Sequence, residues 1–147
     1  PIFVSCISFS QRNTIVTVPL QFHIITDLTM VKDDLVMDSW ISKDDIEEII
    51  LPEVTRIWAD AGISFTVAKI NEVKSLNPPN KSALVDYIVN AGRDASGNSD
   101  PERIRKLNKL IDWSVHSDTA INIYLVPYLG ETSQGNARRK MKRIFMG

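Results

Sequence analysis

Apolar residues crowd together between positions 14 and 27, where the chain reads TIVTVPLQFHIITD. β-Branched and aromatic residues dominate this stretch, and polar residues do not alternate with them as they do in a strand with one solvated face. The pattern therefore predicts a long, largely buried strand of a mixed sheet. Pro19 lies inside it and has no backbone N–H, so we expect an edge position or a bulge partway along the strand.

Residues 42–62 carry the firmest helical pattern of the chain. Apolar residues recur there at helical spacing, at Ile46, Ile49, Ile50, Val54, Ile57, Trp58 and Ala61. Ser42 and Asp45 have the spacing of a capping pair at the start of this helix, and Gly62 stands where a C-terminal cap belongs. Pro52 removes one backbone hydrogen bond, so we expect a kink near Glu48 rather than a break.

Two further apolar stretches predict strands. The stretch 63–70 reads ISFTVAKI and places Ile63, Phe65 and Val67 on one face, and the stretch 121–127 reads INIYLVP and places Ile121, Ile123 and Leu125 on one face. A short closing strand is predicted over 142–146. The order strand, helix, strand in the first half of the chain favours a right-handed parallel crossover.

The segment 77–117 predicts a helical insertion that covers one face of the sheet. Two apolar stripes mark it, one formed by Leu84, Val85, Ile88 and Val89 and the other by Ile104, Leu107, Ile111 and Val115. Such stripes normally mark core, so packing against the sheet is favoured over a regulatory or recognition role. Residues 27–41 show no period, and we expect a loop there.

The composition indicates one globular domain over 1–147, with 44% hydrophobic and 24% charged residues. The formal net charge of −1 gives no general attraction to nucleic acid or to an anionic membrane. No run approaches the ~18 apolar residues of a membrane span. Cys6 is the only cysteine, which excludes an intrachain disulfide and a cysteine-based zinc cluster.

Motifs for catalysis or metal binding are mostly absent from the sequence. The glycines have neither dinucleotide nor P-loop spacing, and there is no Gly-x-Ser-x-Gly elbow. His23 lies among apolar residues, which favours a hydrogen-bonded structural role over metal binding, and His116 is expected to contact helix carbonyls. Adjacent carboxylates at 44–45 and 47–48 are typical of a solvated acidic face. Cys6 has no basic partner nearby in the sequence that would make it a nucleophile.

A basic run, RRKMKR at 138–143, holds five positive charges. A charged edge strand that discourages sheet-to-sheet aggregation is favoured for it. The alternative with a specific function is that this run contacts nucleic acid, but the run contains no aromatic residue for base stacking.

The order of these elements resembles the N-terminal subdomain of metzincin-type zinc metallopeptidases of the pappalysin and archaemetzincin kind. The phrases that carry the resemblance are AGISFTV at 61–67, INIYLVP at 121–127 and GETSQGNA at 130–137. The resemblance implies an α/β (α+β) fold, with a mixed twisted sheet of about four strands, one long backing helix and the helical insertion.

In that family the strand after the glycine-containing loop forms the upper rim of the active-site cleft, and its exposed edge pairs with the backbone of an extended substrate. The resemblance assigns this rim strand to RIFMG at 143–147. It implies that Ile144, Phe145 and Met146 bind substrate through their main chain and that Arg143 adds charge selectivity.

The family's next element is a helix with His-Glu-x-x-His, whose histidines bind zinc and whose glutamate acts as general base. This sequence has no such motif, so we expect no cofactor in this chain, no catalytic or metal-binding residue, and zinc only in a full-length protein. The resemblance then implies either a fragment cut before the catalytic helix, which the ending after an apolar strand favours, or a relative that lost the chemistry. It also implies a peptide or protein substrate and a secreted or periplasmic location.

Two other functions stay open. The chain is alternatively a non-enzymatic interaction module that offers the edge of its last strand to a partner protein or to a second copy of itself. A less favoured alternative is a nucleic-acid binder that uses Arg138, Arg139 and Lys140. Neither nucleic acid nor a membrane is expected as a partner.

Overall fold

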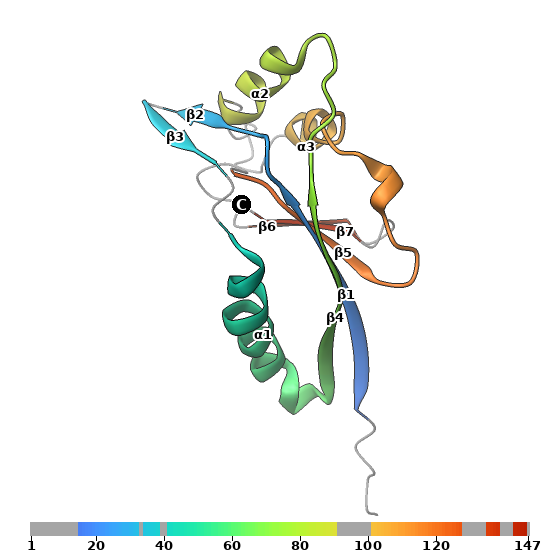
Figure 1. The fold of residues 1–147 in the computed structure, drawn as a ribbon. Helices are drawn as coiled ribbons and strands as arrows, with labels where there is room; N and C mark the ends of the chain where they lie inside the picture. Colours follow the sequence, from blue (N-terminus) through green and yellow to red (C-terminus); the bar gives the residue numbers. More distant parts are fainter. Residues whose placement is uncertain are drawn as a thin grey trace, which may run out of the picture.

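A five-stranded sheet forms the centre of the molecule (Figure 1). The structure is a computed structural model and describes residues 15–32, 34–38, 41–90, 101–127, 135–138 and 143–146. Within these residues the strands follow the order β4 (Ile63–Val73), β1 (Val16–Ile25), β5 (Ile121–Leu125), β7 (Arg143–Met146) and β6 (Gly135–Arg138). The first four are parallel, and β6 is antiparallel to β7. The predicted mixed α/β fold is confirmed, with one strand more than expected.

The described helices lie on both faces of this sheet, and all of them fall between residues 45 and 115. They are η1 (Asp45–Ile50), α1 (Leu51–Trp58), η2 (Ala59–Ala61), α2 (Lys81–Asn90), α3 (Pro101–Leu107) and η3 (Trp113–Val115). In Figure 1, α1 lies beside the lower half of β4, whereas α2 and α3 lie near the upper end of the sheet. No helix in the described part of the chain has both the length and the apolar character to cross a membrane.

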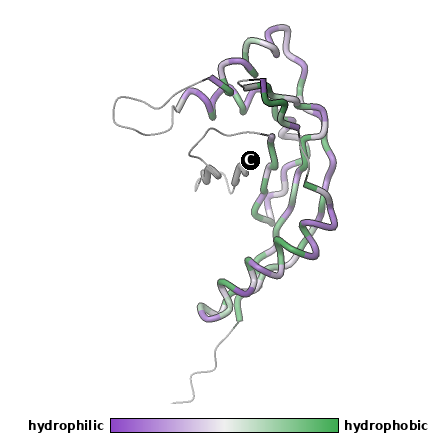
Figure 2. The backbone as a smooth tube through the Cα atoms, turned by 90° about the vertical axis from the view of Figure 1, so that its left-hand side faces the viewer, coloured by the Kyte–Doolittle hydropathy of each residue, from purple (hydrophilic) through white to green (hydrophobic). Residues whose placement is uncertain are grey.

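The two faces of the sheet pack against different helices, because side chains alternate between faces along each strand. On the face that we call the α1 face, Leu20, Phe22, Ile24, Ile123 and Leu125 form a buried cluster with Ile46 of η1. On the opposite face, which we call the α2/α3 face, Ile25, Tyr124 and Val126 pack with Leu84, Ile88, Ile104 and Leu107. The helical insertion therefore covers one face, as predicted. Figure 2 shows hydrophobic and hydrophilic residues alternating along both the strands and the helices.

Pro19 lies in an interior strand, at a point where that strand has one described neighbour. β1 pairs with β4 along its whole length, but its pairing with β5 begins only at Leu20. The pairing with β4 shifts between Leu20 and Gln21, where Ala68 is skipped as the extra residue of a β-bulge. The bulge thus lies in β4 and not in the strand of Pro19, whereas the edge-like position expected for the proline is present, because β1 has one described neighbour there.

The helix predicted over 42–62 begins and ends at the expected caps. The Ser42 N–H donates to Asp45 Oδ2 at 2.8 Å, and the Asp45 N–H donates to Ser42 Oγ at 3.1 Å. Gly62 takes a left-handed conformation with φ 68°, and its N–H donates to the Ala59 carbonyl at 2.9 Å. The irregularity expected near Glu48 takes the form of π-helical η1, which widens the helix just before the proline of α1.

The loop predicted over 27–41 is partly wrong, because β2 (Met30–Lys32) and β3 (Leu35–Met37) form an antiparallel hairpin there. Val31 pairs with Val36 across the hairpin. Asp34, in the turn, has φ 65°, a conformation that aspartate tolerates better than most residues. The sequence signal for this hairpin is two short apolar runs separated by a pair of aspartates.

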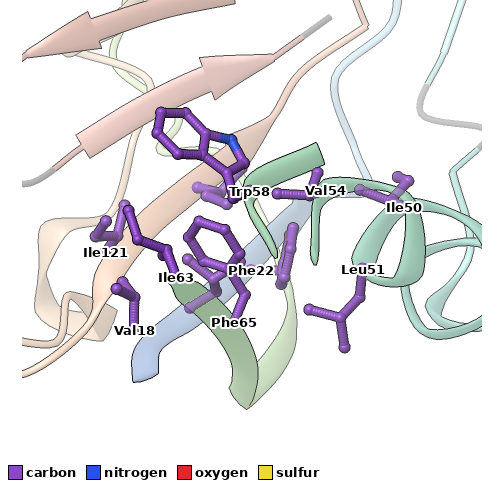
Figure 3. A pocket seen from close by; sticks show the side chains of 11 residues that line it. Val18, Phe22, Ile50, Leu51, Val54, Trp58, Ile63, Phe65 and Ile121 are labelled. Carbon is purple, nitrogen blue, oxygen red and sulfur yellow. The ribbon is translucent and has the colours of Figure 1, made fainter. Parts of the chain in front are cut away.

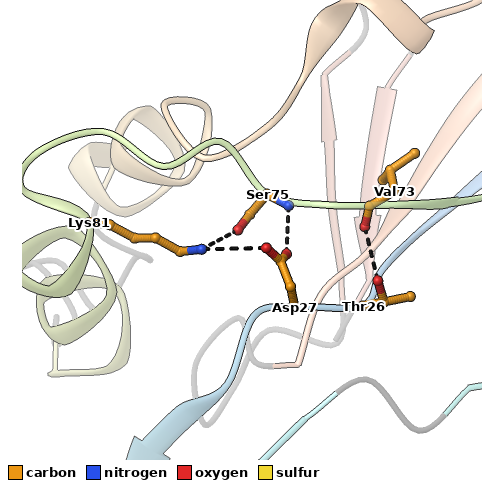
Figure 4. Close-up of polar contacts among 5 residues, drawn as sticks. All are labelled: Thr26, Asp27, Val73, Ser75 and Lys81. Atoms are coloured by element: carbon orange, nitrogen blue, oxygen red, sulfur yellow. Dashed lines mark hydrogen bonds and ion pairs between the residues drawn. The ribbon is translucent and has the colours of Figure 1, made fainter.

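Asp27 fastens the end of β1 to the start of the helical insertion (Figure 4). Its Oδ1 accepts the Ser75 N–H at 2.6 Å, and its Oδ2 lies 3.6 Å from Lys81 Nζ, which also donates to Ser75 Oγ at 2.6 Å. Burial acts to raise the pKa of Asp27, but the hydrogen bonds from Ser75 and the charge of Lys81 outweigh it and lower the pKa below its ordinary value. Asp27 is therefore a carboxylate that anchors α2 to the sheet.

Candidate functional site

A groove of about 420 Å³ opens between α1 and the sheet (Figure 3). Side chains from η1, α1 and three neighbouring strands line it, and all of them are apolar: Val18, Leu20, Phe22, Ile50, Leu51, Val54, Trp58, Ile63, Phe65, Ile121 and Ile123. Because these lining residues contribute no hydrogen-bonding group apart from the Trp58 indole, the groove suits apolar side chains and offers no acid–base chemistry.

The groove exists because α1 is only partly seated on the sheet. No residue of α1 is buried, and Trp58 at its end remains 46% exposed. The Trp58 ring meets the Phe65 ring edge to face, with 6.5 Å between the ring centroids. The tryptophan therefore forms one wall of an open groove instead of closing it.

The apolar residues that predicted this helix are only partly buried in the structure. Ile46 is fully buried, whereas Ile49 and Ile57 are 63% and 60% exposed. The helical side chains that face the sheet repeat at every fourth residue, from Ile46 to Val54 and beyond, which fits the wider π-helical turn at the start of the helix. Part of the predicted stripe is therefore surface.

β6 ends the sheet and is the only antiparallel strand among the five described strands of this sheet. It pairs with β7, and no other described strand pairs with it, so the main-chain groups of its outer side have no strand partner in the described part of the chain. β5, whose side chains line the groove, is followed by β7 and then β6. At a strand spacing of ~4.8 Å, the groove and this edge are on the order of 10 Å apart.

Arg143, Ile144, Phe145 and Met146 do not lie at an edge, contrary to the expectation from the resemblance. Their strand, β7, pairs with β5 on one side and with β6 on the other over all four residues. Both sides of the main chain already belong to the sheet, so no ladder position is left for a substrate. The edge belongs to β6, in a stretch that was predicted as a loop. Residue 147, the end of the predicted rim strand, lies outside the described residues.

A buried polar cluster lies on the α2/α3 face, centred on His23. The ring of His23 is fully buried and stacks on Tyr124 with 4.4 Å between the ring centroids. His23 Nε2 lies 3.1 Å from Asn122 Oδ1, and His23 Nδ1 lies 3.3 Å from Asn71 Nδ2. The predicted structural, hydrogen-bonded role of His23 is confirmed.

Two of the contacts of His23 favour one neutral form of the ring, in which Nε2–H donates to the Asn122 carbonyl oxygen and Nδ1 accepts from the Asn71 amide. Gln21 Nε2, which donates to the Val115 carbonyl, also lies 3.3 Å from His23 Nε2. Burial is the main cause that lowers the pKa of His23 below its ordinary value, and the charges of His116 and Lys69 lower it further, against the hydrogen bond with Asn122. His23 is therefore neutral at pH 7.

His116 joins the same cluster from the segment after η3. Its Nε2 lies 3.4 Å from Asn122 Nδ2, and its backbone N–H donates to the Trp113 carbonyl of η3 at 3.2 Å. The two histidines, far apart in the sequence, thus meet at one asparagine. Among the described residues, no group of three or more histidine, cysteine, aspartate or glutamate side chains is placed to hold a metal ion.

The acidic pairs behave as a solvated face. Asp44, Glu47 and Glu48 are exposed near the start of the helix, and Asp45 serves as its cap. Cys6 and residues 139–142 of the basic run lie outside the described residues.

Sequence reasoning missed the groove, the edge at β6 and the amide partners of His23. A usable signal existed for the last of these, since Gln21 and Asn122 interrupt otherwise apolar strands. A scan against models of protein families, a search of characterised proteins and a search of solved structures each found no match to this chain.

Proposed function

We propose that this chain forms the substrate-side wall of a metzincin-type zinc peptidase and that an extended peptide adds to the outer edge of β6. The observation that carries the proposal is the sheet order, in which one antiparallel strand ends an otherwise parallel sheet and has no partner on its outer side among the described residues. Strand addition at such an edge uses main-chain groups, so it accepts peptides of many sequences.

The groove beside α1 supports the same proposal. It leaves apolar side chains of the helix and sheet uncovered, among them Trp58 and Phe65. A hollow lined in this way is typical of a surface that another protein segment completes. A cleft wall that needs a second half has this character.

A zinc ion bound in the family's manner does not fit this chain. The sequence has no His-Glu-x-x-His, and the described residues contain no candidate ligand cluster. A bound zinc ion would activate water for peptide hydrolysis, and a His-Glu-x-x-His that holds it would have to come from a segment outside these 147 residues. The chain by itself is expected to bind peptide without cleaving it.

Hydrogen exchange tests the binding step. Oxidised insulin B chain serves as an unstructured test peptide, and amide exchange is followed by NMR on the 147-residue chain. We expect slower exchange for those amides of 135–138 that point away from β7 when peptide is added, because they gain main-chain partners. The amides of β4, the strand at the other end of the sheet, are the internal control. Unchanged exchange at β6, or equal protection at both ends of the sheet, would contradict the proposal.

The reading frame after residue 147 tests the catalytic step. A following helix with His-Glu-x-x-His supports the peptidase, and the extended polypeptide should then bind zinc and cleave the test peptide. A stop codon supports the second candidate, an interaction module that uses the same open edge of β6. Peptide protection at β6 is expected for both candidates, so only the second measurement separates them.

A further inference from the structure

The segment between η3 and β5 is tied to the sheet by two amide side chains. Gln21 of β1 donates from Nε2 to the Val115 carbonyl at 2.7 Å. Asn122 of β5 accepts the Ser117 N–H on Oδ1 at 2.9 Å and donates from Nδ2 to the Ser117 carbonyl at 2.7 Å and the Ala120 carbonyl at 3.1 Å. Asn122 therefore holds both the N–H and the carbonyl of one residue in the segment 115–120.

Two histidines hold the Asn122 side chain in place. His23 Nε2–H donates to Asn122 Oδ1, which then accepts two hydrogen bonds, its full capacity. His116 Nε2 faces Asn122 Nδ2 from the other side at 3.4 Å. In this arrangement Asn122 Nδ2 faces an acceptor on His116 only while His116 is neutral, whereas His23 Nε2–H reaches Asn122 Oδ1 in either protonation state of His23.

Protonation of the two histidines would place a donor against a donor at two contacts. A proton on Nδ1 of His23 would point at the N–H of Asn71 Nδ2, 3.3 Å away, so that donor meets donor. A proton on Nε2 of His116 would point at Asn122 Nδ2 in the same way. An unmatched buried polar group destabilises the closed state, and more so when the group is charged.

The surrounding charges oppose protonation as well. The charged groups that act on His23 are His116 and Lys69 of β4, both of which are cationic when protonated. Tyr124 of β5 covers one face of the His23 ring and is neutral in this pH range. The charge on one histidine therefore makes the second protonation harder while the segment stays in place.

We propose that His23, Asn122 and His116 form an acid-sensitive latch, which holds residues 115–120 on the sheet and releases them when the histidines are protonated. The direction of the pH dependence follows from the linkage between proton binding and closure. His23 binds its proton more weakly in the closed state than in an open state where water reaches the ring. Closure is at full strength above about pH 6.5 and weakens as the pH falls below that value. This latch does not depend on the proposed peptidase function, because it involves neither β6 nor the groove.

The latch is tested by native-state hydrogen exchange of the full 147-residue chain between pH 8 and pH 4.5. After correction for intrinsic exchange, the opening constant of the Ser117 amide should rise up to about tenfold per pH unit for each proton taken up. The opening constants of the Phe22 and Ile123 amides, which lie in the strands, should not rise in the same way. A constant that does not change with pH overturns the latch. A parallel rise at all amides also overturns it, because it indicates global acid unfolding.

Asn71→Asp is the decisive variant. It gives the Nδ1–H of protonated His23 an acceptor at the position of the present donor, so the rise at Ser117 should shrink by about tenfold at the acidic end. Lys69→Gln is the matched control on the same strand, since it removes a charge without touching a hydrogen bond of the cluster, and it should change the opening constant less than about threefold. Equal effects of the two variants would count against the latch.

Discussion

The two faces of the sheet differ in how completely they are covered. On the α2/α3 face, Ile88, Leu107 and Tyr124 are fully buried, and even the polar residue His23 has no exposed surface. On the α1 face, the helix leaves a groove of about 420 Å³, and Trp58 is nearly half exposed. Both faces are apolar in sequence, so hydrophobicity alone does not distinguish them.

The difference indicates which layer contributes more to the stability of the fold. A closed layer gains from every buried side chain and loses when any is shortened. An open layer gains little from its exposed apolar residues until another segment covers them. Changes of the same kind on the two faces should therefore have different effects.

The largest difference is expected from shortening an apolar side chain. Ile88→Ala, on the closed face, should lower the free energy of unfolding by about 2–5 kcal/mol, because the fully buried side chain leaves a cavity. Val54→Ala, in the groove, should cost about 1 kcal/mol or less. Urea denaturation of both variants measures this comparison. Equal losses would show that α1 is packed as tightly as α2.

Enlarging a side chain should lower the stability when the residue lies on the α2/α3 face, but not when it lies in the groove of the α1 face. Ile88→Phe should destabilise by about 1–3 kcal/mol, since Ile88 has no exposed surface and is packed within the core. Val54→Phe should be neutral or stabilise by about 0.5–1 kcal/mol, because the ring enters the groove. Thermal unfolding followed by circular dichroism reports both. A loss for Val54→Phe as large as that for Ile88→Phe would mean that the groove is closed in solution.

A smaller effect is expected from the anchor of α2. Asp27→Ala should cost about 1 kcal/mol at pH 7 through the lost hydrogen bond to Ser75. Because the pKa of Asp27 is lowered in the folded state, its contribution is complete above about pH 4 and is lost as the pH falls through the folded-state pKa. Asp27→Asn should retain part of the hydrogen bonding and make the stability less dependent on pH at the acidic end. Stability curves from pH 2 to 7 that coincide for Asp27→Asn and wild type would exclude this role.

The smallest effect is expected on the outer side of α1. Arg56 and Glu53 form an exposed ion pair at 2.6 Å, and exposed pairs are screened by solvent. Arg56→Ala should leave the urea midpoint unchanged within error at 0.15 M salt. A clear loss of stability would indicate that this side of the helix is covered in solution.

Much of the fold follows from local sequence signals. β1 and β5 are dense in β-branched and aromatic residues, and short-range rules identified the caps at Ser42 and Gly62. The hairpin of β2 and β3 and the strand β6 were missed, because three or four residues carry little propensity. The sequence of β6 is Gly-Asn-Ala-Arg, which favours no strand by itself, and its conformation depends on pairing with β7.

The candidate site was harder to predict, because it depends on relations between distant residues. His23 was assigned a structural role from its apolar neighbours, but its partner Asn122 lies 99 residues further along the chain. The exposure of Ile49 and Ile57 goes with a π-helical turn, whereas Pro52 indicated only a kink near Glu48. Likewise, the interior position of β7 depends on where β6 returns to the sheet.

Ala68, the extra residue in β4, determines toward which face of the sheet each later side chain of that strand points. With Ala68 set aside, Ile70 pairs with Phe22 and Asn71 pairs with His23. A continuous ladder through Ala68 would instead place Lys69 opposite Phe22, and an ammonium group would then point toward an apolar layer. Ala68 thus works as a spacer, and a chain lacking it would keep the same pairing along a straighter strand. Position 68 is therefore a point where this sheet should accept a one-residue deletion.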